Sequence, residues 1–170
     1  EDSLLAQQPG SAENPYYHYF RGRKYNIEKK RDSALLEFEK MKGKQANDEV
    51  ALLSEFHVLD LALLNGAMVE PVLMKRIFAA IATTERLNSR LTYRFYDLLA
   101  RAYYQNQNDK KSLAYAALYF ENHPFKTHPV VKQRYFDISF LLASRLGDFK
   151  KMEYYNTQAR ILARQLDDSL

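Results

Sequence analysis

Apolar residues recur along most of this chain at intervals of three and four positions, which is the spacing of amphipathic helices. Short polar segments containing Asn, Gly or Pro interrupt the pattern, and these residue types start or stop helices. The sequence therefore predicts an all-α protein of about eight helices, paired into antiparallel helical hairpins. The helices are expected over residues 15–27, 32–42, 48–64, 71–87, 89–105, 110–122, 129–146 and 150–165, with Phe149 in the last turn.

The first predicted hairpin, residues 15–42, carries the pattern G-x2-Y-x8-A-x3-F, formed by Gly22, Tyr25, Ala34 and Phe38. The two small residues let the helices approach each other, and the two aromatic residues fill the space between and beyond them. On the second helix of this hairpin, the polar face opposite the apolar stripe is expected to point to solvent. That face consists of Glu37, Glu39 and Lys40.

This pattern resembles the tetratricopeptide repeat, a helical hairpin of about 34 residues. The third predicted hairpin resembles it as well, with Ala100 in the Gly place, Tyr103 in the Tyr place and Ser112 where Ala is usual. The resemblance implies stacked hairpins that form a superhelical array, with the first helix of each hairpin lining a concave groove. In the first hairpin, three residues depart from the family's Trp, Leu and Pro: His18, Arg21 and Ala46.

The turns within the hairpins also indicate a repeat. They can be matched at Lys29, Gly66, Gln107 and Gly147, which lie 37, 41 and 40 residues apart. A bundle without repeats has no reason to keep one period. The period is longer than that of the standard unit and resembles the extended tetratricopeptide-like arrays of peptide-responsive signalling regulators. The resemblance implies the interaction or ligand-sensing region of a larger regulatory protein.

The expected organisation is a flexible lead-in over residues 1–14, one helical-repeat domain over residues 15–166 and a tail over residues 167–170. The chain has no Cys, which excludes disulfides and thiolate metal sites and fits a reducing compartment. We therefore expect a cytoplasmic location. No run of about 18 apolar residues occurs, so no membrane span is expected.

The net charge of +4 is unevenly distributed. Residues 15–44 hold nine Lys and Arg against four Asp and Glu, so this segment alone carries +5. A basic segment can attract nucleic acid, and Arg21, Arg23 and Lys24 would then be the contacts to test. The alternative interpretation is a solvated helix face, and the sequence leaves both open.

Motifs that carry catalysis are missing from the sequence, including the nucleophile elbow, the phosphate-binding Gly loop and the HExxH zinc motif. We therefore expect no enzymatic activity and no cofactor. His123 and His128 lie in one Pro-bounded loop, but no carboxylate stands near them at a metal-ligand spacing, so no metal is expected. His57 falls on an apolar helix face and is expected to be packed in the core.

Aligning the repeats places similar charged residues on successive first helices. Arg94 with Asp97, and Arg134 with Asp137, repeat the same pair one hairpin apart. Arg can hold the carboxylates or carbonyls of a peptide through its planar donor fork. The sequence thus predicts a protein or peptide partner, leaves a homodimer open, and leaves open that these pairs only bridge neighbouring helices. The predicted partner-binding residues are Tyr19, Arg23, Asp60, Arg94, Asp97, Arg101, Arg134 and Asp137.

Overall fold

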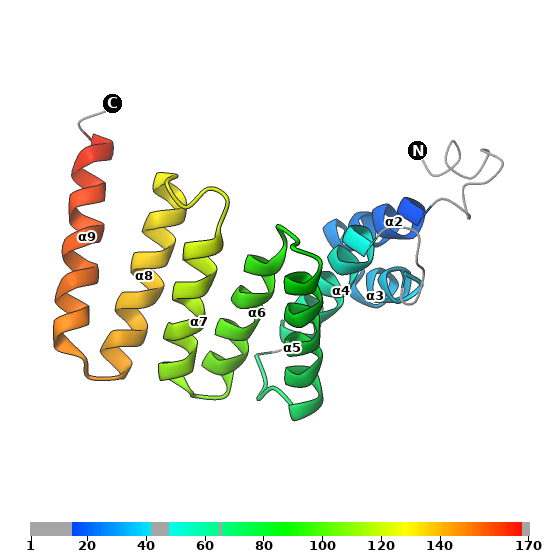
Figure 1. The fold of residues 1–170 in the computed structure, drawn as a ribbon, viewed down its shortest axis with the longest axis horizontal. Helices are drawn as coiled ribbons and strands as arrows, with labels where there is room; N and C mark the ends of the chain where they lie inside the picture. Colours follow the sequence, from blue (N-terminus) through cyan, green and yellow to red (C-terminus); the bar gives the residue numbers. More distant parts are fainter. Residues whose placement is uncertain (1–14, 42–47, 65, 168–170) are drawn as a thin grey trace. The chain divides into compact units, whose positions relative to one another are not determined.

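A computed structural model describes residues 15–41, 48–64 and 66–167 of the chain (Figure 1). Within these residues the chain forms eight α-helices, which confirms the predicted all-α fold with about eight helices. The expected lead-in and the last three residues of the expected tail lie outside the described residues. Among the described helices, none is both long and apolar enough to cross a membrane. The helices are α2 (Pro15–Ile27), α3 (Arg31–Glu39), α4 (Asp48–Leu63), α5 (Pro71–Arg86), α6 (Thr92–Gln105), α7 (Asp109–Asn122), α8 (Pro129–Arg145) and α9 (Phe149–Asp167).

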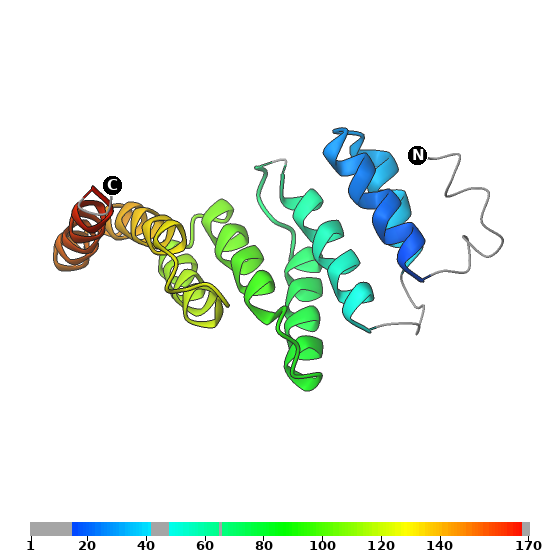
Figure 2. The same ribbon diagram turned by 90° about the horizontal axis from the view of Figure 1, so that it is seen from above.

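The contacts within the chain divide it into two compact units, taken from residues 1–65 and 66–170. In the first unit α2, α3 and α4 pack together. In the second unit α5 to α9 follow one another in chain order, and each helix packs against the next (Figure 1 and Figure 2). The helices of the predicted second hairpin therefore belong to different units, α4 to the first and α5 to the second. The single repeat domain stays a prediction.

Three of the connections between helices share one local structure. Each has three residues, and the middle residue has a left-handed backbone, with φ of 61° at Lys29, 57° at Gln107 and 66° at Gly147. The amide that follows the middle residue donates to the carbonyl five residues earlier, over 2.8 to 3.0 Å. This bond belongs to the Schellman motif, which ends a helix. Gly66, the fourth matched turn residue, is also left-handed at 64°, so all four predicted turn positions share this feature.

The core of the first unit is built around Phe38, which is 1% exposed and packs with Ala34 and Val58. Gly22 lies directly against this ring, because a Cβ atom placed on Gly22 would come within 2.6 Å of Phe38 Cε1. Such a distance is shorter than any non-bonded carbon contact, so this approach of α2 to α3 requires glycine. The predicted packing of small and aromatic residues in the first hairpin is confirmed.

Glu37 corrects the predicted polar face of the first hairpin. The pattern of apolar and polar residues predicts that Glu37 faces solvent. Its side chain is instead buried between α2 and α3, and the residue is only 3% exposed. His18 Nδ1 lies 2.7 Å from Oε2, and Lys40 Nζ donates to Oε1 over 2.9 Å. Burial alone would raise the pKa of Glu37, but these hydrogen bonds and the nearby charge of Arg21 outweigh it and lower the pKa. These polar partners replace the water that an outward side chain would meet.

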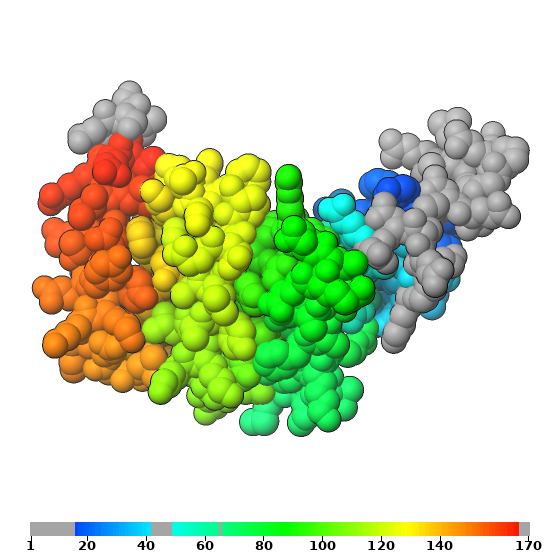
Figure 3. Space-filling model, in the orientation of Figure 1, coloured from blue at the N-terminus to red at the C-terminus, as the bar shows by residue number. Residues whose placement is uncertain are grey.

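The core of the second unit includes α6, and two polar contacts fix its neighbours. Ser112 Oγ on α7 donates to the Ala100 carbonyl over 2.8 Å, so this buried hydroxyl has a hydrogen-bond partner. The Asn106 amide accepts from Val69 N over 2.7 Å and donates to its carbonyl over 3.1 Å. A space-filling view shows α6 to α9 packed side by side in chain order (Figure 3). The fully buried side chains of α6 include Phe95, Leu98 and Leu99.

Candidate functional site

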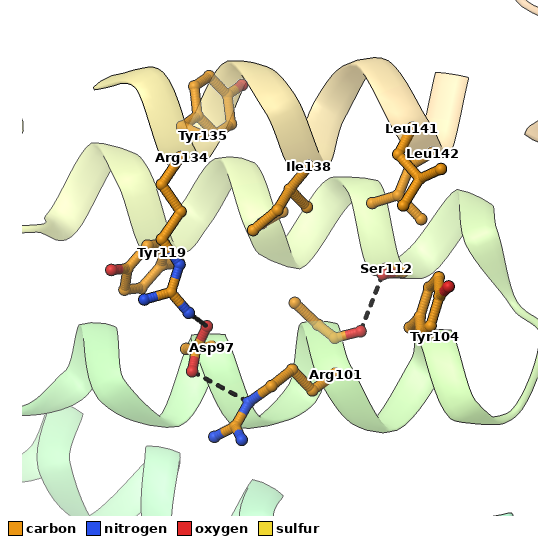
Figure 4. A pocket seen from close by; sticks show the side chains of 12 residues that line it. Asp97, Arg101, Tyr104, Ser112, Tyr119, Arg134, Tyr135, Ile138, Leu141 and Leu142 are labelled. Carbon is orange, nitrogen blue, oxygen red and sulfur yellow. Dashed lines mark hydrogen bonds and ion pairs between the residues drawn. The ribbon is translucent and has the colours of Figure 1, made fainter. Parts of the chain in front are cut away.

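A cavity of about 330 Å³ lies in the second unit between α6, α7 and α8. Its walls are largely apolar and aromatic, with Tyr104 from α6, Ala116 and Tyr119 from α7, and Ile138 and Leu141 from α8 (Figure 4). This volume is at the small end of the range for ligand pockets, roughly 300–1,000 Å³. The cavity therefore has room for a large side chain or a small molecule.

The charged residues that line the cavity meet at Asp97. Its Oδ2 lies 3.1 Å from Arg101 Nε on the same helix, and its Oδ1 lies 4.0 Å from Arg134 Nη2 on α8. Figure 4 shows Arg134 extending from α8 towards Asp97, beside the ring of Tyr119. The Asp97 side chain is 20% exposed, whereas that of Arg134 is 59% exposed. Asp97 thus joins two neighbouring hairpins, and the longer of its two ion pairs is open to solvent.

Tyrosine side chains contribute hydroxyl groups to the same region. Burial raises the pKa of Tyr119, and the nearby carboxylate of Asp97 acts in the same direction against the opposing charge of Arg134. Burial also raises the pKa of Tyr135, as does its hydrogen bond with Tyr155. Both phenols therefore keep their protons at neutral pH. At the α6–α7 turn, the Arg145 guanidinium lies 4.6 Å over the Tyr104 ring and pairs with Asp109 at 3.0 Å.

One residue of the cavity wall, Ala116, can be compared with its counterpart in the first hairpin when the two hairpins are aligned on their turns. Phe38 follows the turn residue Lys29 by nine positions, and Ala116 follows Gln107 by nine positions. The buried ring of the first hairpin is therefore replaced by a methyl group in the third. Ala116 is among the residues that line the cavity. The position that holds the Phe38 ring in the first unit therefore holds a small residue beside the cavity in the second.

The five predicted binding residues of the second unit do not all lie at this cavity. Asp97, Arg101 and Arg134 line it together. Arg94 lies on the same helix as Asp97, with its guanidinium 5.7 Å from the Tyr93 ring. Asp137 is exposed on α8 and accepts a hydrogen bond from Gln133 over 2.8 Å. The Asp97–Arg134 pair joins α6 to α8, whereas the Asp97–Arg101 pair lies within α6, and all three residues border the cavity.

The other three predicted binding residues lie in the first unit, where two of them pack near the core. Tyr19 packs against the Phe38 cluster, and its ring centroid lies 6.0 Å from that of His57. Arg23 Nη1 lies 3.2 Å from His57 Nε2. Asp60 is half-buried on α4. His57 itself is 6% exposed and stacks on Phe38, which confirms the prediction that it is a core residue.

Some Arg side chains of the basic first hairpin form hydrogen bonds or close polar contacts with other side chains of the first unit. Arg21 donates to the hydroxyls of Tyr17 and Tyr25 over 2.9 and 2.8 Å, and these bonds raise its pKa. Arg23 is engaged with His57, as described above. Arg21 and Arg23, which were predicted to contact nucleic acid, therefore have partners within the first unit.

The loop between α7 and α8 uses both of its histidines for local structure. His123 Nδ1 accepts from the Phe125 amide over 3.1 Å, and His128 Nδ1 accepts from the Val130 amide over 3.3 Å at the start of α8. In the part of the chain that the structure describes, no group of three or more His, Asp or Glu side chains is arranged to hold a metal ion.

Sequence reasoning missed the apolar walls of the cavity, which no charged motif marks. The signal that could have found them is the register of the third hairpin. Ala116 stands nine residues after the turn, where the first hairpin has its largest core side chain. The residues missed in this way are Tyr104, Ala116, Tyr119 and Ile138.

This sequence was compared with protein-family models and with curated proteins. No protein-family model matches this sequence, and no curated protein is significantly similar to it.

Proposed function

We propose that this protein is a tetratricopeptide-like helical-repeat protein that binds a protein or peptide partner and catalyses no reaction. The binding site in this proposal is the α6–α8 groove, defined as the cavity together with Asp97, Arg101 and Arg134. The sequence resemblance extends the proposal to the interaction or ligand-sensing region of a larger regulatory protein in the cytoplasm.

The observation that carries the proposal is an apolar cavity whose open side bears charged groups. Partners anchor themselves to such sites by placing one or two large side chains in a preformed cavity, while polar groups around it set their orientation. The groove offers both parts, with Tyr104 and Ile138 in the wall and the exposed Arg134 also among the lining residues. The shared turns of the first, third and fourth hairpins support the repeat architecture.

A variant that closes the cavity tests the proposal. Ala100 and Ala116 stand at the positions of Gly22 and Phe38, so the double change Ala100→Gly with Ala116→Phe builds the core pair of the first hairpin into the third. Random peptides displayed on phage are selected against the intact chain, and their affinities are measured by fluorescence anisotropy. We expect the closed variant to lose about tenfold or more in affinity.

Two further variants act as controls. Ala100→Gly alone reports the effect of a glycine at this position of α6, about 1 kcal/mol of stability, separately from that of the added ring. Arg160→Ala removes an exposed Arg from α9 and should change nothing. Circular dichroism confirms that each variant is folded. Peptides that bind the closed variant as tightly as the parent chain would place the site elsewhere.

The nucleic-acid alternative has its own readout. Affinity for DNA or RNA that falls steeply with salt and disappears on changing Arg21, Arg23 and Lys24 to Ala would favour the basic hairpin over the groove.

A further inference from the structure

The first unit shows which side chain occupies the position that is open in the second. Phe38 stacks on His57 with ring centroids 4.9 Å apart and planes 18° apart. Counted from the turns, Phe38 corresponds to Ala116, and His57, nine residues before Gly66, corresponds to Ile138, nine residues before Gly147. Ala116 and Ile138 both line the cavity. The cavity therefore lies where this repeat can pack an aromatic ring.

The remaining walls suit a ring as well. Tyr104, Tyr119 and Tyr135 come from three different helices and all line the cavity. Aromatic rings favour offset-stacked and edge-to-face contacts with other rings, and they contribute large contact areas to interfaces. An aromatic side chain from a partner would meet such rings on several sides.

The charges around the cavity favour an acidic partner. Two Arg and one Asp line it, and the carboxylate of Asp97 is already held by Arg101 at 3.1 Å. Arg134 is 4.0 Å from the same carboxylate and its side chain is 59% exposed. Its guanidinium therefore retains donor capacity towards solvent, and it can hold a second carboxylate through paired hydrogen bonds.

We infer that the α6–α8 groove binds a linear peptide with an aromatic side chain in the cavity and a neighbouring carboxylate on Arg134. This inference rests on the proposed function, because it assigns a ligand class to the same groove.

The test uses a short labelled peptide in which one Phe stands between two Asp within a Gly and Ser frame. Two matched peptides carry Ala in place of Phe, or Asn in place of both Asp. Fluorescence anisotropy with the intact chain should show about tenfold weaker binding without the ring. It should show about fivefold weaker binding without the carboxylates, and a smaller difference between acid and amide as salt increases.

A double-mutant cycle assigns the carboxylate to its partner. Arg134→Gln keeps much of the length of the side chain and removes its charge, so it should erase the preference for Asp over Asn. The matched control Arg160→Gln, on the exposed surface of α9, should retain that preference. If both variants discriminate equally, Arg134 does not bind the carboxylate and the inference is wrong.

Other results separate this inference from the proposed function. Display-selected peptides that need the open cavity but lack an aromatic and acidic pair would overturn the ligand class and leave the groove in place. If no peptide, selected or designed, binds the groove, both proposals fail. N-acetylphenylalanine binding as tightly as the peptide would assign the cavity to a small molecule. A dimer in sedimentation that the closed variant abolishes would assign it to a second copy of the chain.

Discussion

The three-helix sets α2–α3–α4 and α6–α7–α8 have the same turn between their first two helices. They differ in the side chain nine residues after the left-handed residue of that turn. In the first set, nine residues after the left-handed Lys29, Phe38 fills the centre and Gly22 gives it room. In the second set, nine residues after Gln107, Ala116 borders a cavity of about 330 Å³. The same turn can therefore be followed by a buried aromatic ring, as in the first set, or by a small residue beside a cavity, as in the second.

The two units also bury different polar groups. The first buries the carboxylate of Glu37, held by His18 and Lys40, whereas the buried polar side chains described in the second are all hydroxyls, among them Ser112 on a backbone carbonyl. A buried carboxylate must be matched by its partners because its desolvation costs several kcal/mol. A hydroxyl needs only one acceptor. Substitutions should therefore affect the two units through different mechanisms and to different extents.

The largest effect is expected from Phe38→Ala, which gives the first hairpin the residue of the third. It removes a fully buried ring and should reduce the free energy of unfolding by about 3–5 kcal/mol. Urea denaturation measures the loss, and hydrogen exchange should show it first in α2, α3 and α4. A loss below about 1 kcal/mol would mean that the first hairpin tolerates an open cavity as the third does.

The next effect is expected from Gly22→Ala, although Ala favours helices by about 1 kcal/mol. The added Cβ would lie 2.6 Å from the ring of Phe38, so overpacking should cost about 1–3 kcal/mol. The control Gly147→Ala meets open space and strains only a left-handed backbone, at about 1–2 kcal/mol. Adding Phe38→Leu to Gly22→Ala should restore part of the stability, and failure to do so would exclude the clash as the cause.

A third effect is expected from Glu37→Gln, which should cost about 1–3 kcal/mol at neutral pH because donors lose a charged acceptor. The pKa of Glu37 is lowered in the folded state, so its ionised form stabilises the fold above the ordinary value near 4.5. That contribution is lost as the pH falls through the lowered pKa. Thermal unfolding from pH 7 to pH 3 should show the difference between variant and parent shrinking in acid. A constant difference would contradict this origin.

The smallest effect is expected from Ser112→Ala in the second unit, at about 0.5–1.5 kcal/mol. The change introduces the Ala that is usual at this position of the tetratricopeptide repeat, but it removes the donor to the Ala100 carbonyl. The matched control is Ser144→Ala, which changes an exposed Ser on α8 of the same unit. Urea denaturation of the two variants separates the loss of the buried bond from a general effect of replacing Ser by Ala. Equal stabilities for the two variants would show that the bond contributes nothing.

Much of the fold could be predicted because its signals are local. Helix spacing in the sequence, together with Pro15, Pro71 and Pro129 at helix starts, predicted elements close to those observed. The orientation of Glu37 could not be predicted in this way, since a charged residue at that position normally faces water. Its burial depends on His18, nineteen positions away, and on Lys40, which together supply the hydrogen bonds.

The candidate site was predictable only in part. Arg101 and Arg134 stand out as charged residues on first helices, and they do line the cavity. Tyr19 and Arg23 align with Asp97 and Arg101 of the third hairpin, yet they lie against Phe38 and His57 in the first unit. A periodic alignment places residues on a face but does not determine whether that face is filled by a neighbouring side chain.

The sequence by itself determined the helices, their turns and the period, because helix spacing and left-handed turn positions depend on residues close together in the chain. Tertiary structure decided where the space between helices is filled by side chains and where a cavity remains. An Ala in a helix is compatible with either outcome, and only the packing of α6, α7 and α8 leaves space beside Ala116. Volume is a property of side chains from several helices, so the cavity appears only when those helices come together.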